Sequence, residues 1–236
     1  MKLLLISNSK LHGGGYLDHC ADEIQKFLEN VSDVLFIPYA RPSGMTHDEY
    51  TNIARERYKK MGFELTGIHQ HSDSGEAVEN AEAIFIGGGN TFVLLKQLYE
   101  NDLIKKIRKQ VKKGTPYIGT SAGSNVACRN IKTTNDMPIV YPPSFDGLNL
   151  VPFNINPHYI DPDPSSKHMG ETRETRIEEF HHYNDEYVVG LREGAMLHVV
   201  DGEIVLKGST GARVFKNNKK PEEYKPEDSL DFIMKE

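Results

Sequence analysis

A serine lies between two glycines in Gly119-Thr120-Ser121-Ala122-Gly123, directly after the apolar run Tyr117-Ile118. A G-x-S-x-G pattern at a strand-to-helix junction is typical of a nucleophile elbow, because the glycines allow a turn that exposes the serine hydroxyl. The stretch that follows, residues 124–129, is compatible with a helix. The pattern predicts hydrolysis with Ser121 as the nucleophile. The alternative is a glycine-lined turn around an incidental serine.

Two groups of backbone amides are candidates for binding the oxyanion that a serine nucleophile generates. The N–H of Ala122 follows the nucleophile at the expected start of a helix, where amide donors have no partner in the helix. The run Gly87-Gly88-Gly89-Asn90 follows another expected strand, and its missing side chains allow a close approach of the backbone. The alternative for this run is an ordinary turn before a helix, with Asn90 or Thr91 as the N-cap.

Ten histidines compete for the role of general base, and His158 has the most suitable context. It follows Pro157 in a region, residues 130–165, that is rich in Pro, Asn and Asp and is expected to form loops around the site. Two acids are candidates for orienting the base: Asp136, between the nucleophile and His158, and Glu193, at the end of an expected strand. The sequence does not separate them, and either is alternatively a partner for the charged amine of a substrate.

The run His12-Gly13-Gly14-Gly15 is similar to the H-G-G-G oxyanion motif of lipases and esterases. That motif belongs after the third strand of an α/β-hydrolase, whereas this run follows the first expected strand. Only 37 positions separate Ser121 from His158, which leaves little room for the elements that an α/β-hydrolase inserts there. The spacing therefore argues against an esterase.

Short apolar runs alternate with amphipathic stretches in the first half of the chain, which is the pattern of βαβ units. The runs expected as strands are Leu3–Ile6, Val34–Ile37, Phe63–Ile68, Ala83–Ile86 and Tyr117–Ile118. The helices expected between them are Tyr16–Glu29, His47–Met61, Phe92–Tyr99 and Leu103–Lys112. We expect an α/β fold with three α/β/α layers and a mostly parallel sheet, and a site beyond the carboxyl ends of its strands.

The second half of the chain predicts shorter elements. These are a helix over Glu171–His182 and strands over Tyr187–Leu191, Ala195–Val200, Glu203–Leu206 and Arg213–Phe215. Asp201-Gly202, between two of these strands, is a two-residue hairpin signal. Charge and proline dominate from Asn217 onward, so residues 217–236 are expected to form a surface tail, either a strap or a frayed end. We expect a single domain over residues 1–236.

The composition is that of a soluble globular protein, with 38% hydrophobic and 26% charged residues. The net charge of −6 argues against nucleic acid as the main partner. Two cysteines are too few for a disulfide framework, and the first apolar run is too short for a signal peptide or a membrane span. We therefore expect a cytoplasmic protein without a membrane partner. No paired zinc-ligand spacing occurs, so no metal or cofactor is expected.

Six segments together resemble one known family: Ser7-Asn8-Ser9, IFIGGGNTF at 84–92, YIGTSA at 117–122, TTNDMPIV at 133–140, INPH at 155–158 and GETR at 170–173. Their order, and their spread over nearly the whole chain, resemble the peptidase E family of α-aspartyl dipeptidases, which are serine peptidases related to cyanophycinase. The resemblance implies a fold similar to class I glutamine amidotransferase domains. It also implies a cytosolic enzyme that hydrolyses dipeptides with an N-terminal aspartate without a metal. The partner expected is a small peptide substrate, and the protein itself is expected to be a monomer or a small homo-oligomer.

By motif, the resemblance implies four roles: Ser121 as nucleophile, His158 as general base, and Gly89 and Ala122 as oxyanion donors. For the third catalytic member, the family is described both with the aspartate that matches Asp136 and with the glutamate that matches Glu193. We favour Glu193 as the partner of the histidine, because it is expected at a strand end. Asp136 is kept as a second acidic residue of the catalytic site.

The substrate side chain is expected to be bound by Arg173, which matches the arginine of the family's GETR segment. A guanidinium binds a carboxylate through two parallel hydrogen bonds, which a site selective for aspartate over asparagine requires. Asn90 is a second expected substrate-binding residue. The alternative for Arg173 is an arginine on the surface of a helix, paired with Glu171 or Glu174.

Two other functions remain open from the sequence. One is a cyanophycinase-like enzyme that cleaves aspartyl–arginine linkages, and the other is a non-catalytic module that binds an acidic metabolite. A complete set of Ser121, His158 and an acid argues against the second alternative, because a sensor needs no nucleophile.

Overall fold

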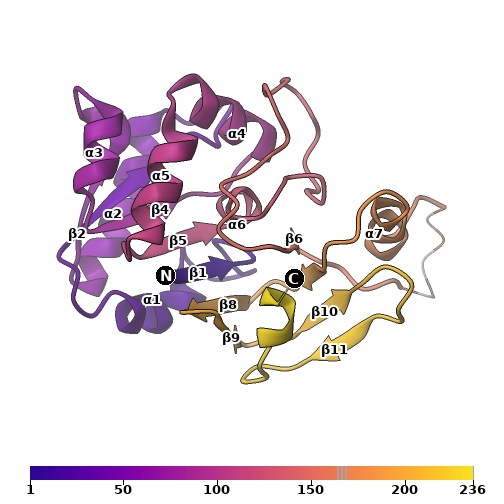
Figure 1. Cartoon of the computed structure of the whole chain (residues 1–236). Coiled ribbons are helices and arrows are strands. Elements are labelled where there is room, and N and C mark those ends of the chain that lie inside the picture. Colours follow the sequence, from indigo (N-terminus) through magenta and orange to yellow (C-terminus); the bar gives the residue numbers. More distant parts are fainter. Residues whose placement is uncertain (164, 166, 168, 236) are drawn as a thin grey trace.

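A seven-stranded sheet forms the centre of the protein, in the order β3-β2-β4-β5-β1-β8-β9 (Figure 1). The computed structural model describes residues 1–163, 165, 167 and 169–235. The strands are β1 (Lys2–Ile6), β2 (Asp33–Ile37), β3 (Glu64–Gly67), β4 (Ala83–Ile86), β5 (Tyr117–Thr120), β8 (Ala195–Val200) and β9 (Glu203–Gly208). The first five run parallel, and β8 and β9 are added in antiparallel pairing beside β1. The expected mostly parallel sheet is confirmed.

Helices cover both faces of this sheet, as the sequence predicted. The helices of the first part are α1 (Ala21–Phe27), α2 (His47–Met61), α3 (Ser74–Asn80), α4 (Thr91–Glu100), α5 (Leu103–Lys112) and α6 (Ala122–Ala127). Side chains alternate along each strand, so Leu3 and Leu5 pack in the cluster of α3 to α6, whereas Leu4 and Ile6 pack with α1 and α2. The result is the expected three-layer α/β/α arrangement.

A second, four-stranded sheet lies beside the first, in the order β11-β10-β7-β6 (Figure 1). Its strands are β6 (Asn154–Pro157), β7 (Val188–Leu191), β10 (Ala212–Phe215) and β11 (Glu222–Tyr224), and α7 (Arg173–His181) lies in the chain between β6 and β7. β6 and β7 pair in parallel, with Pro157 opposite Leu191. The carboxyl ends of two strands therefore meet at this point of the second sheet.

Several local expectations needed correction. The segment expected as one helix over Tyr16–Glu29 begins with a short 3-10 helix (Asp18–Cys20) before α1, and the strand expected over Phe63–Ile68 ends at Gly67 in another 3-10 turn (Ile68–Gln70). β6 falls in a region expected to form loops, and α3 was not predicted.

The segment expected as a surface tail is a strap rather than a frayed end. β11 pairs with β10, and a 3-10 helix (Asp231–Met234) follows. Leu230 and Ile233 are fully buried in the main core cluster. Apolar residues that are spaced among charges at the end of the chain therefore complete the core.

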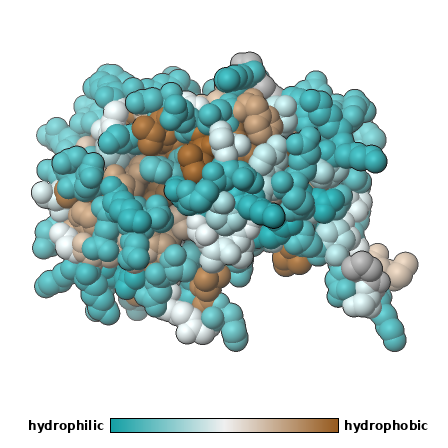
Figure 2. Space-filling view, turned by 90° about the horizontal axis from the view of Figure 1, so that it is seen from below, coloured by the Kyte–Doolittle hydropathy of each residue, from teal (hydrophilic) through white to brown (hydrophobic). Residues whose placement is uncertain are grey.

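The hairpin between β8 and β9 is confirmed, with Asp201 at φ 50° and Gly202 at φ 94°, as a two-residue hairpin turn requires. Hydrophilic side chains cover most of the face seen in Figure 2. Over the described residues, no helix is both long enough and apolar enough to cross a bilayer.

Candidate active site

Ser121 occupies a strained turn between β5 and α6, with φ 51° and ψ −106°. Few residues other than glycine adopt a positive φ, and such backbone strain is concentrated at functional sites. A Cβ on Gly119 would lie 2.6 Å from the carbonyl of Gly123, and one on Gly123 would overlap the carbonyl oxygen of Ile86 in β4. Both glycines of the motif are therefore needed for close backbone packing under the serine.

We expect Gly123→Ala to lower the free energy of unfolding by about 3 kcal/mol, because β4 has to move to admit the added methyl group. Urea denaturation of wild type and variant measures the difference. Gly14→Ala is the matched control, since a Cβ there meets its nearest atom, the Leu11 carbonyl oxygen, at an ordinary 3.5 Å. Equal unfolding midpoints for Gly123→Ala and wild type would contradict this account of the elbow.

His158 is placed beside the nucleophile by the end of β6. Its backbone has a φ of 53°, and its N–H donates to the Ser7 Oγ at 2.9 Å. The Ser7 hydroxyl in turn donates to the Leu191 carbonyl at 2.8 Å. The Nε2 of His158 lies 3.0 Å from the Ser121 Oγ. This distance is within the reach that a general base needs to accept the hydroxyl proton.

Glu193 lies on the other side of the imidazole, two residues after β7 ends. Its Oε1 is 2.6 Å from the Nδ1 of His158. Its loop is fixed by the Gly194 N–H, which donates to the Asn8 Oδ1 at 2.8 Å, and by the Thr210 hydroxyl, which donates to the Glu193 carbonyl at 2.7 Å. The parallel pairing of β6 with β7 brings the histidine and the glutamate side by side, so a serine–imidazole–carboxylate chain is complete.

Asp136 lies outside this chain of hydrogen bonds. Its Oδ2 accepts from the Thr91 N–H at 2.7 Å, the Thr91 hydroxyl at 2.6 Å and the Thr134 hydroxyl at 3.2 Å. It therefore binds the first turn of α4, where free N–H groups attract an anion. In the described residues Asp136 makes no hydrogen bond with His158, and the structure brings Glu193 rather than Asp136 to the imidazole.

Asn90 forms the N-cap of α4. Its Oδ1 accepts from the Val93 N–H at 3.1 Å, and its Nδ2 donates to the Met137 carbonyl at 2.9 Å. This is the capping alternative that the sequence offered. The side chain also attaches the loop after Asp136 to the glycine-rich turn.

The two expected oxyanion donors come from turns that approach the serine. A Cβ on Gly88 would lie 3.2 Å from the Ser121 Cβ, so the turn after β4 passes against the nucleophile. The N–H of Gly89 has no hydrogen-bond acceptor among the described residues, and its φ of 148° fits its close approach to Ala40. Ala122 is the first residue of α6, where the N–H has no partner in its own helix.

Two backbone amides of the His12–Gly15 run already have hydrogen-bond partners within their own loop. The Gly14 N–H donates to the Leu11 carbonyl at 3.0 Å, and the Gly15 N–H donates to the Asp18 carboxylate at 2.6 Å. These amides stabilise their own loop, so an esterase-type oxyanion role has no support in this geometry.

Arg173 is the first residue of α7 and has no carboxylate or hydrogen-bond partner among the described residues. The two acids considered as alternative partners are engaged elsewhere, because Glu171 pairs with Arg176 at 3.5 Å and Glu174 pairs with Arg213 at 2.9 Å. Partial burial and the neighbouring Arg176 lower the pKa of Arg173, whereas the charge of Asp136 raises it. The guanidinium lines a hollow between the 160–163 segment and the start of α7 and is free to bind an anion.

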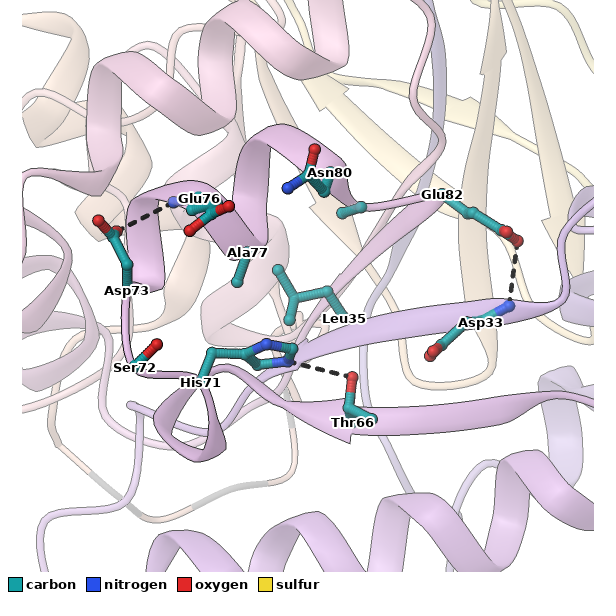
Figure 3. A pocket seen from close by; sticks show the side chains of 11 residues that line it. Asp33, Leu35, Thr66, His71, Ser72, Asp73, Glu76, Ala77, Asn80 and Glu82 are labelled. Atoms are coloured by element: carbon teal, nitrogen blue, oxygen red, sulfur yellow. Dashed lines mark hydrogen bonds between the residues drawn. The ribbon is translucent and has the colours of Figure 1, made fainter.

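A different hollow, at the β3 edge of the main sheet, carries acidic side chains that are already used for structure (Figure 3). Asp73 caps α3 by accepting from the Gly75 and Glu76 N–H groups, and Glu82 accepts from the N–H of Asp33. Burial and the nearby Glu82 raise the pKa of Asp33. These contacts explain the carboxylates of Asp73 and Glu82 without a ligand.

The cysteines offer no competing nucleophile. Burial raises the pKa of both Cys20 and Cys128 to about 12, so their thiols stay protonated near neutral pH. Among the residues that the structure describes, no three His, Cys, Asp or Glu side chains are grouped so that they could hold a metal ion.

Sequence reasoning missed the supporting roles of Ser7 and Asn8. Both are fully buried polar residues directly after β1, and they bind the backbone of His158 and Gly194. The signal was a run of polar residues at the carboxyl end of an apolar strand, where α/β folds place their ligand-binding groups.

The chain matches peptidase family S51 over residues 3–207. It is 49% identical over 235 residues to a probable alpha-aspartyl dipeptidase of Drosophila melanogaster, which covers 98% of this chain and 97% of that protein. It is 48% identical over 223 residues to a peptidase E of Streptomyces coelicolor, with 94% and 90% covered. A solved structure of a peptidase from an acI-B1 actinobacterium has a TM-score of 0.75 at 18% identity, covers 97% of this chain and 96% of that one, and shows the shared fold.

Proposed function

Because the chain belongs to peptidase family S51, we propose that it is a serine dipeptidase that hydrolyses dipeptides with an N-terminal aspartate through an acyl-enzyme on Ser121. The observation that carries the proposal is the continuous hydrogen-bonded chain from the Ser121 hydroxyl through His158 to Glu193. A nucleophile, a base and an acid that orients the base are the requirements of this chemistry.

In the proposed reaction, the Nε2 of His158 takes the proton of the Ser121 hydroxyl as the oxygen attacks the peptide carbonyl. The N–H groups of Gly89 and Ala122 then stabilise the oxyanion. Glu193 accepts from the Nδ1–H of the imidazole and stabilises its positive charge. The imidazolium returns the proton to the leaving amine, and water, activated by the same histidine, releases the aspartyl group.

Substrate selection is proposed to rest on the charges opposite the N-terminal aspartate. This residue carries a side-chain carboxylate and an α-ammonium group. Arg173 supplies an unpaired guanidinium for the carboxylate. The carboxylate of Asp136, held at the start of α4 next to Asn90, acts electrostatically on Arg173 and supplies the negative charge for the ammonium group. A cation and an anion that act on each other electrostatically fit a substrate residue that carries both charges.

We expect wild type to hydrolyse Asp-Leu with a kcat/KM at least about 100-fold above that for Asn-Leu, because asparagine leaves a half-buried guanidinium unpaired. In Arg173→Gln the preference is expected to fall below about tenfold. Initial rates with both peptides measure the ratio. Arg129→Gln is the matched control, since it removes the same charge from an arginine that is paired with Glu186 and does not line the hollow at Arg173, and it should keep the wild-type ratio.

Equal rates on Asp-Leu and Asn-Leu by wild type would contradict the specificity. A preference for β-aspartyl-arginine over Asp-Leu would favour the cyanophycinase-like alternative. Binding of Asp-Leu without any turnover would favour a non-catalytic acidic-metabolite module.

A further inference from the structure

Arg41 lies beside the proposed oxyanion donor, four residues beyond the end of β2. The carbonyl of the preceding residue, Ala40, accepts from the Asn90 N–H at 2.7 Å. A Cβ on Gly89 would overlap the same carbonyl oxygen. The backbone that carries Arg41 is thus packed directly against the glycine-rich turn.

The side chain of Arg41 is connected to the same turn by a second route. Its guanidinium carbon lies 4.9 Å from the centre of the Tyr50 ring. The Tyr50 hydroxyl donates to the Gly88 carbonyl at 3.1 Å, and the Cβ position of Gly88 is 3.2 Å from the Ser121 Cβ. Stacking on this ring therefore connects the cation, through the Tyr50 hydroxyl, to the glycine-rich turn that passes against the nucleophile.

Arg41 lacks an anionic partner. Its Nε is buried without a hydrogen bond, and no carboxylate of the described residues lies within ion-pair distance of it. Asp18, an acid in the segment between β1 and α1, pairs with Arg57 at 2.9 Å instead. A buried donor on a charged group that has no partner costs free energy, which a bound anion would recover.

Arg41 and Arg173 both lack a carboxylate partner among the described residues. Each of the other arginines of the described chain has a carboxylate, amide or carbonyl partner: Arg55, Arg57, Arg108, Arg129, Arg176, Arg192 and Arg213. Two unpaired guanidinium groups therefore remain: that of Arg41, stacked on Tyr50 beside the glycine-rich turn, and that of Arg173, on which the charge of Asp136 acts. An aspartyl dipeptide also carries two carboxylates, one on the aspartate side chain and one at its C-terminus.

We propose that Arg41 binds the free α-carboxylate of the leaving residue and thereby restricts the enzyme to dipeptides. This inference rests on the proposed function. Arg173 lies near Asp136, the pair of charges that fits the N-terminal aspartate, so the remaining cation is left for the other end of the substrate. A longer peptide has no carboxylate at that position and would leave Arg41 unpaired.

The test compares Asp-Leu with Asp-Leu-amide, two peptides that differ by the charge at the C-terminus. Wild type is expected to have a roughly 10- to 100-fold higher kcat/KM for Asp-Leu, carried mainly by a lower KM, because the ion pair is present before and during the reaction. Arg41→Gln is expected to lose this preference by slowing Asp-Leu hydrolysis, with Asp-Leu-amide changed less than about threefold. Arg41→Lys should retain part of the preference, since an ammonium keeps the charge without the planar fork.

Arg129→Gln is the charge-matched control, because Arg129 pairs with Glu186 outside the residues placed at the site, and it should keep the full preference. The inference is overturned if wild type cleaves both peptides equally well or if Arg41→Gln keeps the preference for Asp-Leu. The wild-type comparison decides even if Arg41→Gln does not fold. Absence of turnover with either peptide overturns the proposed function, and this inference with it, whereas Asp-Leu turnover without discrimination overturns the inference alone.

Discussion

Replacing Ser121 with alanine is expected to lower kcat for Asp-Leu by about 10⁵-fold or more. The hydroxyl that lies 3.0 Å from the Nε2 of His158 is the atom that forms the acyl-enzyme, and the methyl group that replaces it cannot attack a carbonyl. The residual rate would come from oxyanion binding and substrate positioning alone. Initial rates at saturating substrate measure the loss, and mass spectrometry of acid-quenched enzyme should detect an aspartyl adduct only in wild type.

Ser124→Ala is the matched control for this experiment. The Ser124 hydroxyl is buried three residues further along and donates to the carbonyls of Ile6 and Gly119. We expect this variant to lose about 1 kcal/mol of unfolding free energy and to retain activity within about tenfold. Comparable turnover by Ser121→Ala and wild type would eliminate the mechanism, and an intact thermal transition in Ser121→Ala would exclude unfolding as the cause of its inactivity.

The part of the site that could be predicted from sequence is the part encoded locally. The elbow at Ser121 and the turn at Gly87–Gly89 follow short apolar runs that form β5 and β4, and glycine is needed at both because backbone atoms approach closely. Alternation of such runs with amphipathic helices was sufficient to predict the parallel sheet and its two helical layers.

β6 could not be predicted because its composition is that of a loop. Asparagine is a residue type that is rare in strands, yet Asn154 and Asn156 are both buried in this strand. Asn154 donates to the Asn130 side chain at 2.7 Å, and Asn156 donates to the Thr133 carbonyl at 2.8 Å. The hydrogen-bond partners of these amides lie more than twenty residues away in the sequence, so no local sequence pattern predicts these contacts.

The choice between the two acids depended on the same long-range pairing. The sequence named both Asp136 and Glu193 as acids that could orient His158, and Glu193 was favoured only because it was expected at a strand end. The register that places Pro157 opposite Leu191 brings Glu193 to the imidazole, whereas Thr91 and Thr134 hold the Asp136 carboxylate at the start of α4. The three-dimensional pairing thus separates the roles of these two carboxylates.

The same principle applies to Arg173. The alternative from the sequence was an ion pair with Glu171 or Glu174, but Glu171 pairs with Arg176, and Glu174 pairs with Arg213 of β10, which is distant in the sequence. The ion pair between α7 and β10, which no motif predicts, thus leaves Arg173 free for a ligand. Arg41 had no signal in the sequence, because its importance lies in the lack of a partner among side chains that only the fold brings near it.

The division of roles between the two carboxylates gives the second large expected effect. Glu193→Gln is expected to lower kcat for Asp-Leu by about 10²- to 10⁴-fold, because a neutral amide no longer stabilises the imidazolium and can hold the ring in the wrong tautomer. The lower figure allows for solvent screening, since the His158 and Glu193 side chains are 40% and 50% exposed. Steady-state kinetics with separate kcat and KM values measure the effect.

Asp136→Asn is the matched control, because it makes the same carboxylate-to-amide change at the other acid considered as the partner of His158. Its carboxylate accepts from Thr91 and Thr134 and does not touch the imidazole, so we expect the loss to appear mainly as a higher KM, through the unbalanced charge beside Arg173. If Asp136→Asn instead lowered kcat more than Glu193→Gln does, the acid at α4 would be the one that supports catalysis, and the hydrogen bond of 2.6 Å between His158 and Glu193 would serve structure alone. The two variants therefore test a functional consequence of one strand register, that of β6 on β7.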